Sequence, residues 1–144
     1  MTKEEALRFN TSTLAYLGDA VFEVIIREKI VREKSGDTDR AHHTAVRYVS
    51  AAGQAAAAKS MIALGFLTDE ETALFKRARN HRSMSRPANA DPKIYKIATG
   101  FEALLGYLYL TDERERLREI AAEAVRIVDV QSKRAAAQTG AGRK

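Results

Sequence analysis

Two stretches of the chain are apolar except for a single carboxylate each. Residues 14–22 contain Asp19, and residues 99–110 contain Glu102. A carboxylate is almost never fully buried without a partner, and leaving one uncompensated in an apolar setting costs several kcal/mol, roughly. The fold therefore has to give Asp19 and Glu102 an edge exposed to water, a basic neighbour, or a divalent cation held between them.

Both stretches also contain glycine, which costs a helix about 1 kcal/mol relative to alanine. Gly18 precedes Asp19, and Gly100 and Gly106 flank Glu102. Close approach of two backbones is one reason for glycine inside a helix. We therefore predict that two helices cross at these glycines and that the two acids converge there.

The rest of the sequence favours an all-α fold. The chain of 144 residues suits one domain, it contains only two prolines, and no segment shows the period-two alternation of a strand. Apolar spacing and capping residues predict about seven helices. They cover residues 4–33 with a break near 10–13, then 38–51, 54–64, 69–80, 92–110 and 111–130, with Gly53 separating the third from the fourth.

The terminal residues and the composition limit the setting of the protein. Residues 131–144 are basic, rich in Ala and Gly and free of large apolar side chains, so we expect a disordered or weakly helical tail after a domain spanning residues 1–130. The chain has no cysteine and no apolar run long enough to cross a membrane, and its first residues are polar and acidic. These features favour the cytoplasm, and the net charge of +5 favours a polyanionic partner such as nucleic acid.

A cation between the two acids would turn two anomalies into one site. Carboxylates brought together repel each other unless a cation intervenes, and Mg²⁺ prefers oxygen ligands. Such a metal could polarise a phosphate for hydrolysis. Two simpler interpretations remain open: Asp19 caps a helix or forms an ion pair, and Glu102 pairs with Lys93 or Lys96.

Two further residues lie one helical turn from the acids. Glu23 follows Asp19, and Thr99 precedes Glu102, so each is a candidate to contact the metal's ligands from outside. Glu23 could equally pair with Arg27 four residues later, which is the favoured alternative.

Residues 76–86 are the densest basic run of the chain. Arginine matches phosphate geometry, and Asn and Ser add neutral donors, whereas the lack of aromatic residues argues against single-strand stacking. Contact with a duplex backbone is the better match, with a solvated helix end as the alternative. The candidate RNA contacts in this run are Arg77, Arg79, Asn80, Arg82 and Ser83.

Arg40, His42, His43 and Arg47 form a second, weaker basic cluster, of which Arg47 is a further candidate RNA contact. The two histidines are adjacent and His81 is remote, so no zinc-ligand spacing is present.

Together these motifs resemble the Mini-ribonuclease III family. The matching segments, in family order between about residues 12 and 125, are 14–23, 47–51 with Gln54, 76–80 and 99–108. The resemblance implies a ribonuclease III-type endonuclease domain that cleaves double-stranded RNA with Mg²⁺, for which Mn²⁺ can substitute. It implies Asp19 and Glu102 as catalytic residues and metal ligands, and maturation of the ends of the 23S ribosomal RNA precursor.

The resemblance also implies a homodimer and the absence of a separate RNA-binding domain. Residues 15–26 are apolar around most of their helix, which independently requires burial in the core or against a partner. The larger ribonuclease III pattern has Glu where this chain has Ala15 and Asp where it has Thr99, so we expect one Mg²⁺ per site. A ribosomal protein as a further partner is left open.

Two other function classes compete with the nuclease. The first is a non-catalytic double-stranded RNA-binding or ribosome-assembly factor on the same fold. The second is a helical DNA-binding regulator, for which the only candidate recognition helix, residues 69–80, is a poor match.

Overall fold

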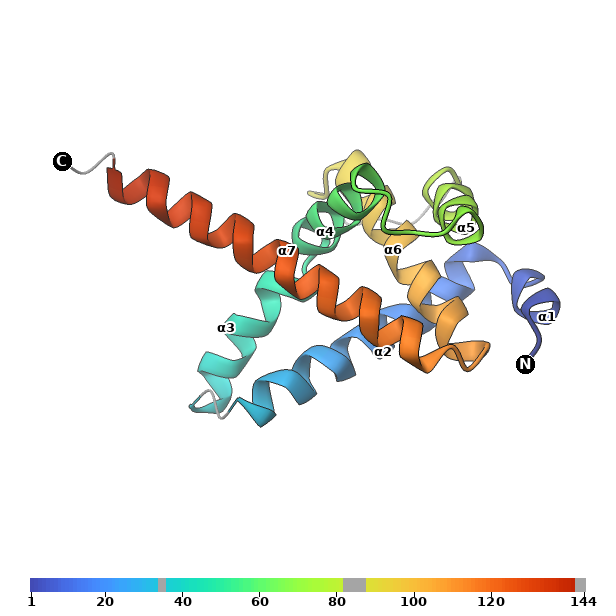
Figure 1. The fold of residues 1–144 in the computed structure, drawn as a ribbon, viewed down its shortest axis with the longest axis horizontal. Helices are drawn as coiled ribbons and strands as arrows, with labels where there is room; N and C mark the ends of the chain where they lie inside the picture. Colours follow the sequence, from blue (N-terminus) through green and yellow to red (C-terminus); the bar gives the residue numbers. More distant parts are fainter. Residues whose placement is uncertain (34–35, 82–87, 142–144) are drawn as a thin grey trace.

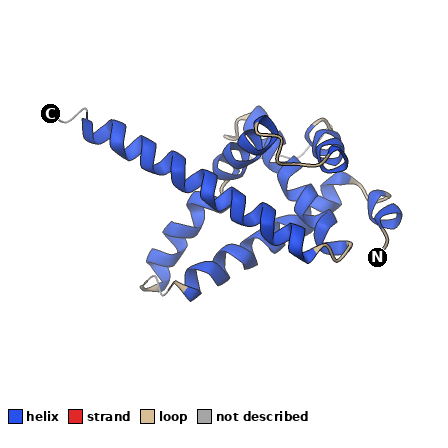
Figure 2. Cartoon of the chain, in the orientation of Figure 1, coloured by secondary structure: helices blue, strands red, loops and turns tan. Residues whose placement is uncertain are grey.

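The computed structural model describes residues 1–33, 36–81 and 88–141. In these residues the chain forms seven helices and no strand (Figure 2), which confirms the all-α expectation. The helices are α1 (Lys3–Leu7), α2 (Thr11–Arg32), α3 (Thr38–Val49), α4 (Ala51–Ala63), α5 (Asp69–Arg79), α6 (Pro92–Leu110) and α7 (Arg114–Ala141).

Helix α6 lies in the middle of the molecule, with α2 crossing it and α4, α5 and α7 packed around it (Figure 1). From Ala98 to Leu108 it exposes little apart from one edge carrying Thr99 and Glu102. Because an apolar helix must be covered on every side, α6 organises the core. Phe22 of α2 meets Phe101 of α6 edge to face, with ring centroids 5.2 Å apart.

Capping residues set most helix starts as the sequence predicts. Thr68 and Glu71 form a reciprocal capping box at α5, and Asp91 caps α6 ahead of Pro92 in its first turn. The predicted break at Gly53 is wrong. Ser50 is the N-cap of α4, and its hydroxyl accepts a hydrogen bond from the Gly53 N–H inside the first turn of that helix.

Helix α7 is longer than predicted. Its last buried residue is Val128, yet the helix continues to Ala141 and its end projects from the rest of the fold (Figure 1). The alanines at positions 135–137 carry high helix propensity, so the backbone stays helical without packing against the core. The division into a domain of residues 1–130 and a tail of residues 131–144 stays a prediction. Within the described ranges, no helix has the length and apolarity needed to span a membrane.

Candidate active site

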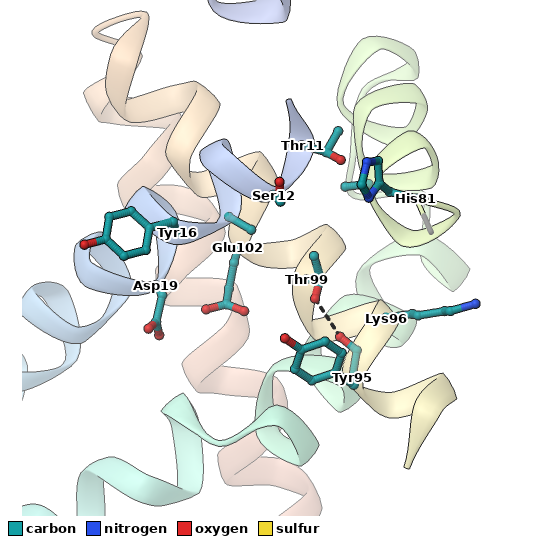
Figure 3. A pocket seen from close by; sticks show the side chains of 11 residues that line it. Thr11, Ser12, Tyr16, Asp19, His81, Tyr95, Lys96, Thr99 and Glu102 are labelled. Carbon is teal, nitrogen blue, oxygen red and sulfur yellow. Dashed lines mark hydrogen bonds between the residues drawn. The ribbon is translucent and has the colours of Figure 1, made fainter. Parts of the chain in front are cut away.

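A hollow of about 520 Å³ opens where α2, α6 and the end of α5 meet (Figure 3). Both predicted acids line it. The lining residues are Thr11, Ser12, Ala15, Tyr16 and Asp19 from α2, Ala78 and His81 from the end of α5, and Tyr95, Lys96, Thr99 and Glu102 from α6.

The two acids meet because α2 and α6 cross with their backbones in contact. A Cβ added at Gly18 would lie 1.7 Å from the carbonyl oxygen of Glu102, and one added at Gly106 would lie 2.0 Å from the carbonyl oxygen of Leu14. No side chain fits at either position, so the predicted glycine crossing is confirmed. Gly100 serves another contact, since its Cα faces Phe75 of α5.

The crossing places the two carboxylates side by side at one end of the hollow (Figure 3). Asp19 is exposed, whereas Glu102 is half-buried. Burial raises the pKa of Glu102 to about 8, and the neighbouring Asp19 carboxylate adds to the rise. Among the described residues, neither acid forms an ion pair with a lysine or arginine, so the expected alternatives of Lys93 or Lys96 as a partner for Glu102 are not realised.

These two acids suit a hard divalent cation. They supply adjacent oxygen ligands whose mutual repulsion no described side chain neutralises. No group of three or more His, Cys, Asp or Glu side chains gathers anywhere in the described chain. A cation at this site would therefore take its remaining ligands from water and from a bound phosphate.

The two residues one turn away behave differently from each other. Glu23 pairs with Arg27, with Nε and Oε2 3.0 Å apart, and does not line the hollow, which confirms the ion pair favoured from the sequence. Thr99 does line it. The Thr99 hydroxyl donates to the Tyr95 carbonyl at 2.9 Å, so it can offer only acceptor lone pairs to a ligand in the hollow.

The described candidate RNA contacts lie outside the hollow, and several have partners within the protein. Arg77 donates to the carbonyls of Leu7 and Phe9 at 3.3 and 3.2 Å and so holds the end of α1. Arg79 donates to Asn80 Oδ1 at 3.2 Å.

Arg47 is also engaged within the protein. It donates to Asp129 of α7 at 3.1 Å and to the Tyr48 hydroxyl at 3.2 Å. The predicted contacts Arg82 and Ser83 lie outside the described residues. The RNA-binding roles of all these residues stay predictions.

Sequence reasoning missed three residues of the hollow: Thr11, Ser12 and Tyr95. A helical-period signal was available for them. Thr11 and Ser12 precede Asp19 by two helical turns, and Tyr95 precedes Glu102 by two turns, so they share the faces of the acids.

Comparison with known proteins matches this arrangement of motifs. Residues 12–113 match the family model described as the ribonuclease III domain. The chain is 43% identical over 113 residues to Mini-ribonuclease 3 of Enterococcus faecalis, covering 78% of this chain and 86% of the relative. It is 41% identical over 129 residues to Mini-ribonuclease 3 of a Thermoanaerobacter species, covering 90% and 89%. A crystal structure of a Fusobacterium nucleatum protein superimposes with a TM-score of 0.72 at 27% identity, covering 83% of this chain and 93% of that one.

Proposed function

This chain belongs to the Mini-ribonuclease 3 family of ribonuclease III-type endoribonucleases, and from that premise we propose that it cleaves double-stranded RNA in a magnesium-dependent reaction at Asp19 and Glu102. The observation that carries the proposal is the pair of adjacent carboxylates, one of them half-buried, with no cationic side chain beside it in the described chain. A purely structural pair of acids would be costly in that state. A bound cation would offset the cost.

Asp19 and Glu102 are the residues that would hold Mg²⁺. When bound, the ion supplies Lewis-acid polarisation of the scissile phosphate and lowers the pKa of a water that attacks it. Glu102 has to release the proton held on its carboxyl group before it can act as a ligand, because its pKa in the metal-free protein is about 8. The Gly18–Gly106 crossing fixes the spacing of the two acids, and the buried wall of α6 limits access of water to the Glu102 side.

The proposed substrate is the precursor of 23S ribosomal RNA, whose ends the enzyme would mature in the cytoplasm. The support for it is the family membership and the net charge of +5, which favours a polyanion. A ribosomal protein that presents the RNA would be compatible with this role.

A homodimer would place two such sites on one duplex. The support is an apolar strip on α2 formed by Leu17, Ala20 and Val24, of which Val24 is 67% exposed. Leu17, Ala20 and Val24 line a second hollow of about 350 Å³ together with Tyr109 and Leu117. Exposed apolar surface of this kind is characteristic of protein interfaces. If the strip is the dimer interface, Val24→Glu will sediment as a monomer, whereas an unchanged dimer would exclude the strip.

The cleavage test uses a perfect RNA duplex with labelled strands. We expect cuts with Mg²⁺, none with excess chelator, and none above background with Asp19→Asn or Glu102→Gln. Duplex affinity, measured in excess chelator so that no cation bridges the acids to a phosphate, should stay within about threefold of the wild type, since the two acids themselves do not contact the phosphate backbone.

Glu115→Gln on exposed α7 is the matched control and should cleave like the wild type. Cleavage that survives both site substitutions would refute the assignment. Duplex binding without any cleavage by the wild type would favour the non-catalytic binder instead.

A further inference from the structure

We propose that the hollow contains a second site, at the N-terminus of α2, which binds a backbone phosphate of the substrate RNA a short distance from the scissile one. That the phosphate belongs to RNA rests on the proposed function. The anion site itself rests on three observations: a buried hydroxyl without a partner, an uncapped helix N-terminus, and the distribution of charge along the hollow.

Thr11 is the first observation. Its side chain is 3% exposed, and its Oγ1 is buried without a hydrogen-bond partner among the described residues. It lines the same hollow as the two acids and lies at the opposite end of it (Figure 3). A buried polar atom left unpaired costs about 1–3 kcal/mol, so it calls for a partner that the described residues do not supply.

The second observation is that the N-terminus of α2, where Thr11 lies, has no side-chain cap. Asn10 is the N-cap residue of α2, but its side chain makes no capping hydrogen bond. The N–H groups of Thr13 and Leu14 both donate to the Asn10 carbonyl, whereas those of Thr11 and Ser12 have no acceptor in the described chain. The N-terminus of this 22-residue helix, with free N–H donors and the positive end of the helix dipole, thus lies beside the hollow that Thr11 and Ser12 line.

The third observation is the charge along the hollow. Both carboxylates lie at one end of the hollow, and His81 lies beside Thr11 at the other (Figure 3). Lys96 also lines the hollow, and its side chain extends away from the carboxylates (Figure 3). Neither His81 nor Lys96 forms an ion pair within the described residues. Asp19 follows Thr11 by eight residues, about 12 Å along the helix axis. One end of the hollow therefore suits a cation and the other an anion.

Another unpaired buried atom shows why Thr11 is distinctive. Gln54 Oε1 is also buried without a partner in the part of the chain that the structure describes, but Gln54 lies inside α4, its amide nitrogen donates to the Val49 carbonyl, and it does not line this hollow. At Thr11 the orphan hydroxyl and the free N–H groups coincide at the end of the hollow away from both carboxylates. That combination is the donor set of a phosphate site.

The test compares Thr11→Val, which has nearly the same shape without the hydroxyl, with Thr11→Ser, which keeps it. We expect Thr11→Val to bind an RNA duplex about tenfold more weakly in chelator, and Thr11→Ser to bind within about threefold of the wild type. The melting temperature of Thr11→Val should be unchanged or higher, because no internal hydrogen bond is lost. Thr139→Val, on the exposed end of α7, is the control and should change neither property.

Duplexes carrying one uncharged methylphosphonate locate the phosphate. In the wild type, a methylphosphonate at one position near the cut should lower duplex affinity about tenfold. In Thr11→Val, the same substitution should lower affinity less than about threefold. Wild-type affinity of Thr11→Val, or an equal penalty in both proteins at every position, would overturn the proposal. So would a loss of affinity matched by a fall in melting temperature, since that outcome makes Thr11 structural.

Inorganic phosphate separates this inference from the proposed function. Millimolar phosphate should shift the amide resonances of Thr11 and Ser12 in the wild type and shift them much less in Thr11→Val. This result would stand even if the protein failed to cut RNA. Cleavage of RNA without any such shift or methylphosphonate effect would leave the nuclease intact and overturn the second site.

Discussion

Two glutamates on facing helices, Glu71 and Glu102, show opposite ways of placing a carboxylate in this fold. Glu71 is only 6% exposed, yet both of its oxygens accept hydrogen bonds from Arg116, and Oε1 also accepts one from the Thr68 N–H. Burial alone would raise the pKa of Glu71, but these bonds outweigh it and lower the pKa. Glu102 is more exposed than Glu71, but its charged neighbour is another carboxylate, Asp19. Burial, together with that neighbour, raises the pKa of Glu102 to about 8.

The different surroundings of the two glutamates distinguish a structural ion pair at Glu71 from a proposed metal site at Glu102. Arg116 also donates to the Phe66 carbonyl, so the Glu71 ion pair ties the start of α7 to α5 and to the loop before it. That carboxylate accepts three hydrogen bonds and has its charge balanced by Arg116, so it does not call for a cation. The Glu102 site is unsatisfied, and the missing positive charge is what a metal would add. The fold thus accepts an energetic cost at the site we propose for chemistry and none at its structural pair.

The largest expected difference between the two glutamates is in pH dependence. The folded protein binds the Glu102 proton more tightly than the unfolded chain, since its pKa is about 8 against an ordinary 4.5. The free energy of unfolding of the metal-free protein should therefore fall as pH rises between those values, by several kcal/mol in total at a limiting slope of about 1.4 kcal/mol per pH unit.

Urea unfolding from pH 5 to pH 9 measures that effect as the difference between the wild type and Glu102→Gln. The variant should be flatter and more stable than the wild type at pH 8. Mg²⁺ should stabilise the wild type more at pH 9 than at pH 7, because the cation competes with the proton. Parallel curves for the two proteins would mean that Glu102 is not protonated in the fold.

Breaking the satisfied pair is the next largest effect. Glu71→Gln weakens both hydrogen bonds from Arg116 and leaves its partly buried guanidinium with only the exposed Glu119 as counterion, which should cost about 3 kcal/mol of unfolding free energy. The folded variant should still cleave RNA at a normal rate per folded molecule. Chemical denaturation and cleavage at low temperature measure the two quantities. Normal stability with lost cleavage would reverse the roles assigned to the two glutamates.

The crossing beneath Glu102 offers a smaller effect. Alanine at Gly18 places a methyl group 1.7 Å from the Glu102 carbonyl oxygen, so α2 and α6 must separate. We expect a loss of about 2 kcal/mol in stability together with weaker Mg²⁺ binding, because the two acids move apart. Gly65→Ala is a useful control, since its added methyl meets no atom within 4 Å and only the positive φ of 68° is strained. Normal Mg²⁺ affinity in Gly18→Ala would show that the spacing of the acids is not set by the crossing.

The smallest expected effect concerns Arg77, a cationic side chain that has hydrogen-bond partners within the protein. Arg77→Ala removes two hydrogen bonds to the end of α1 and should cost about 1 kcal/mol of stability. RNA affinity, measured on the same samples, should fall less than it does for Lys96→Ala, whose ammonium has no internal ion pair in the described chain. Unchanged stability with a large loss of RNA affinity would restore Arg77 to the RNA-binding role predicted from the sequence.

The sequence predicts that Asp19 and Glu102 meet because the signals for that meeting are local and anomalous. A lone acid beside a glycine in an apolar helix is visible in a short window, and both features are explained by one crossing of α2 and α6. The family resemblance supplies the chemistry that spacing alone leaves open between a metal site and ordinary ion pairs. Gly53 misleads because a glycine in a first helical turn resembles a glycine that ends a helix.

The parts that the sequence does not predict depend on long-range packing. Thr11 resembles any polar residue at a helix start, and only the fold shows that its hydroxyl is buried without a partner among the described residues. Arg77 belongs to a basic run, but the position of α1 decides that it holds carbonyls. The helical end of α7 has no apolar pattern, so its extent follows from propensity alone.

Crystals grown with Mn²⁺ test the central claim most directly, because anomalous scattering locates the ion independently of activity. We predict one peak per protomer within about 2.5 Å of carboxylate oxygens from both Asp19 and Glu102, and no peak at that position in Glu102→Gln. A peak held by other residues, or one that persists unchanged in Glu102→Gln, would contradict the account.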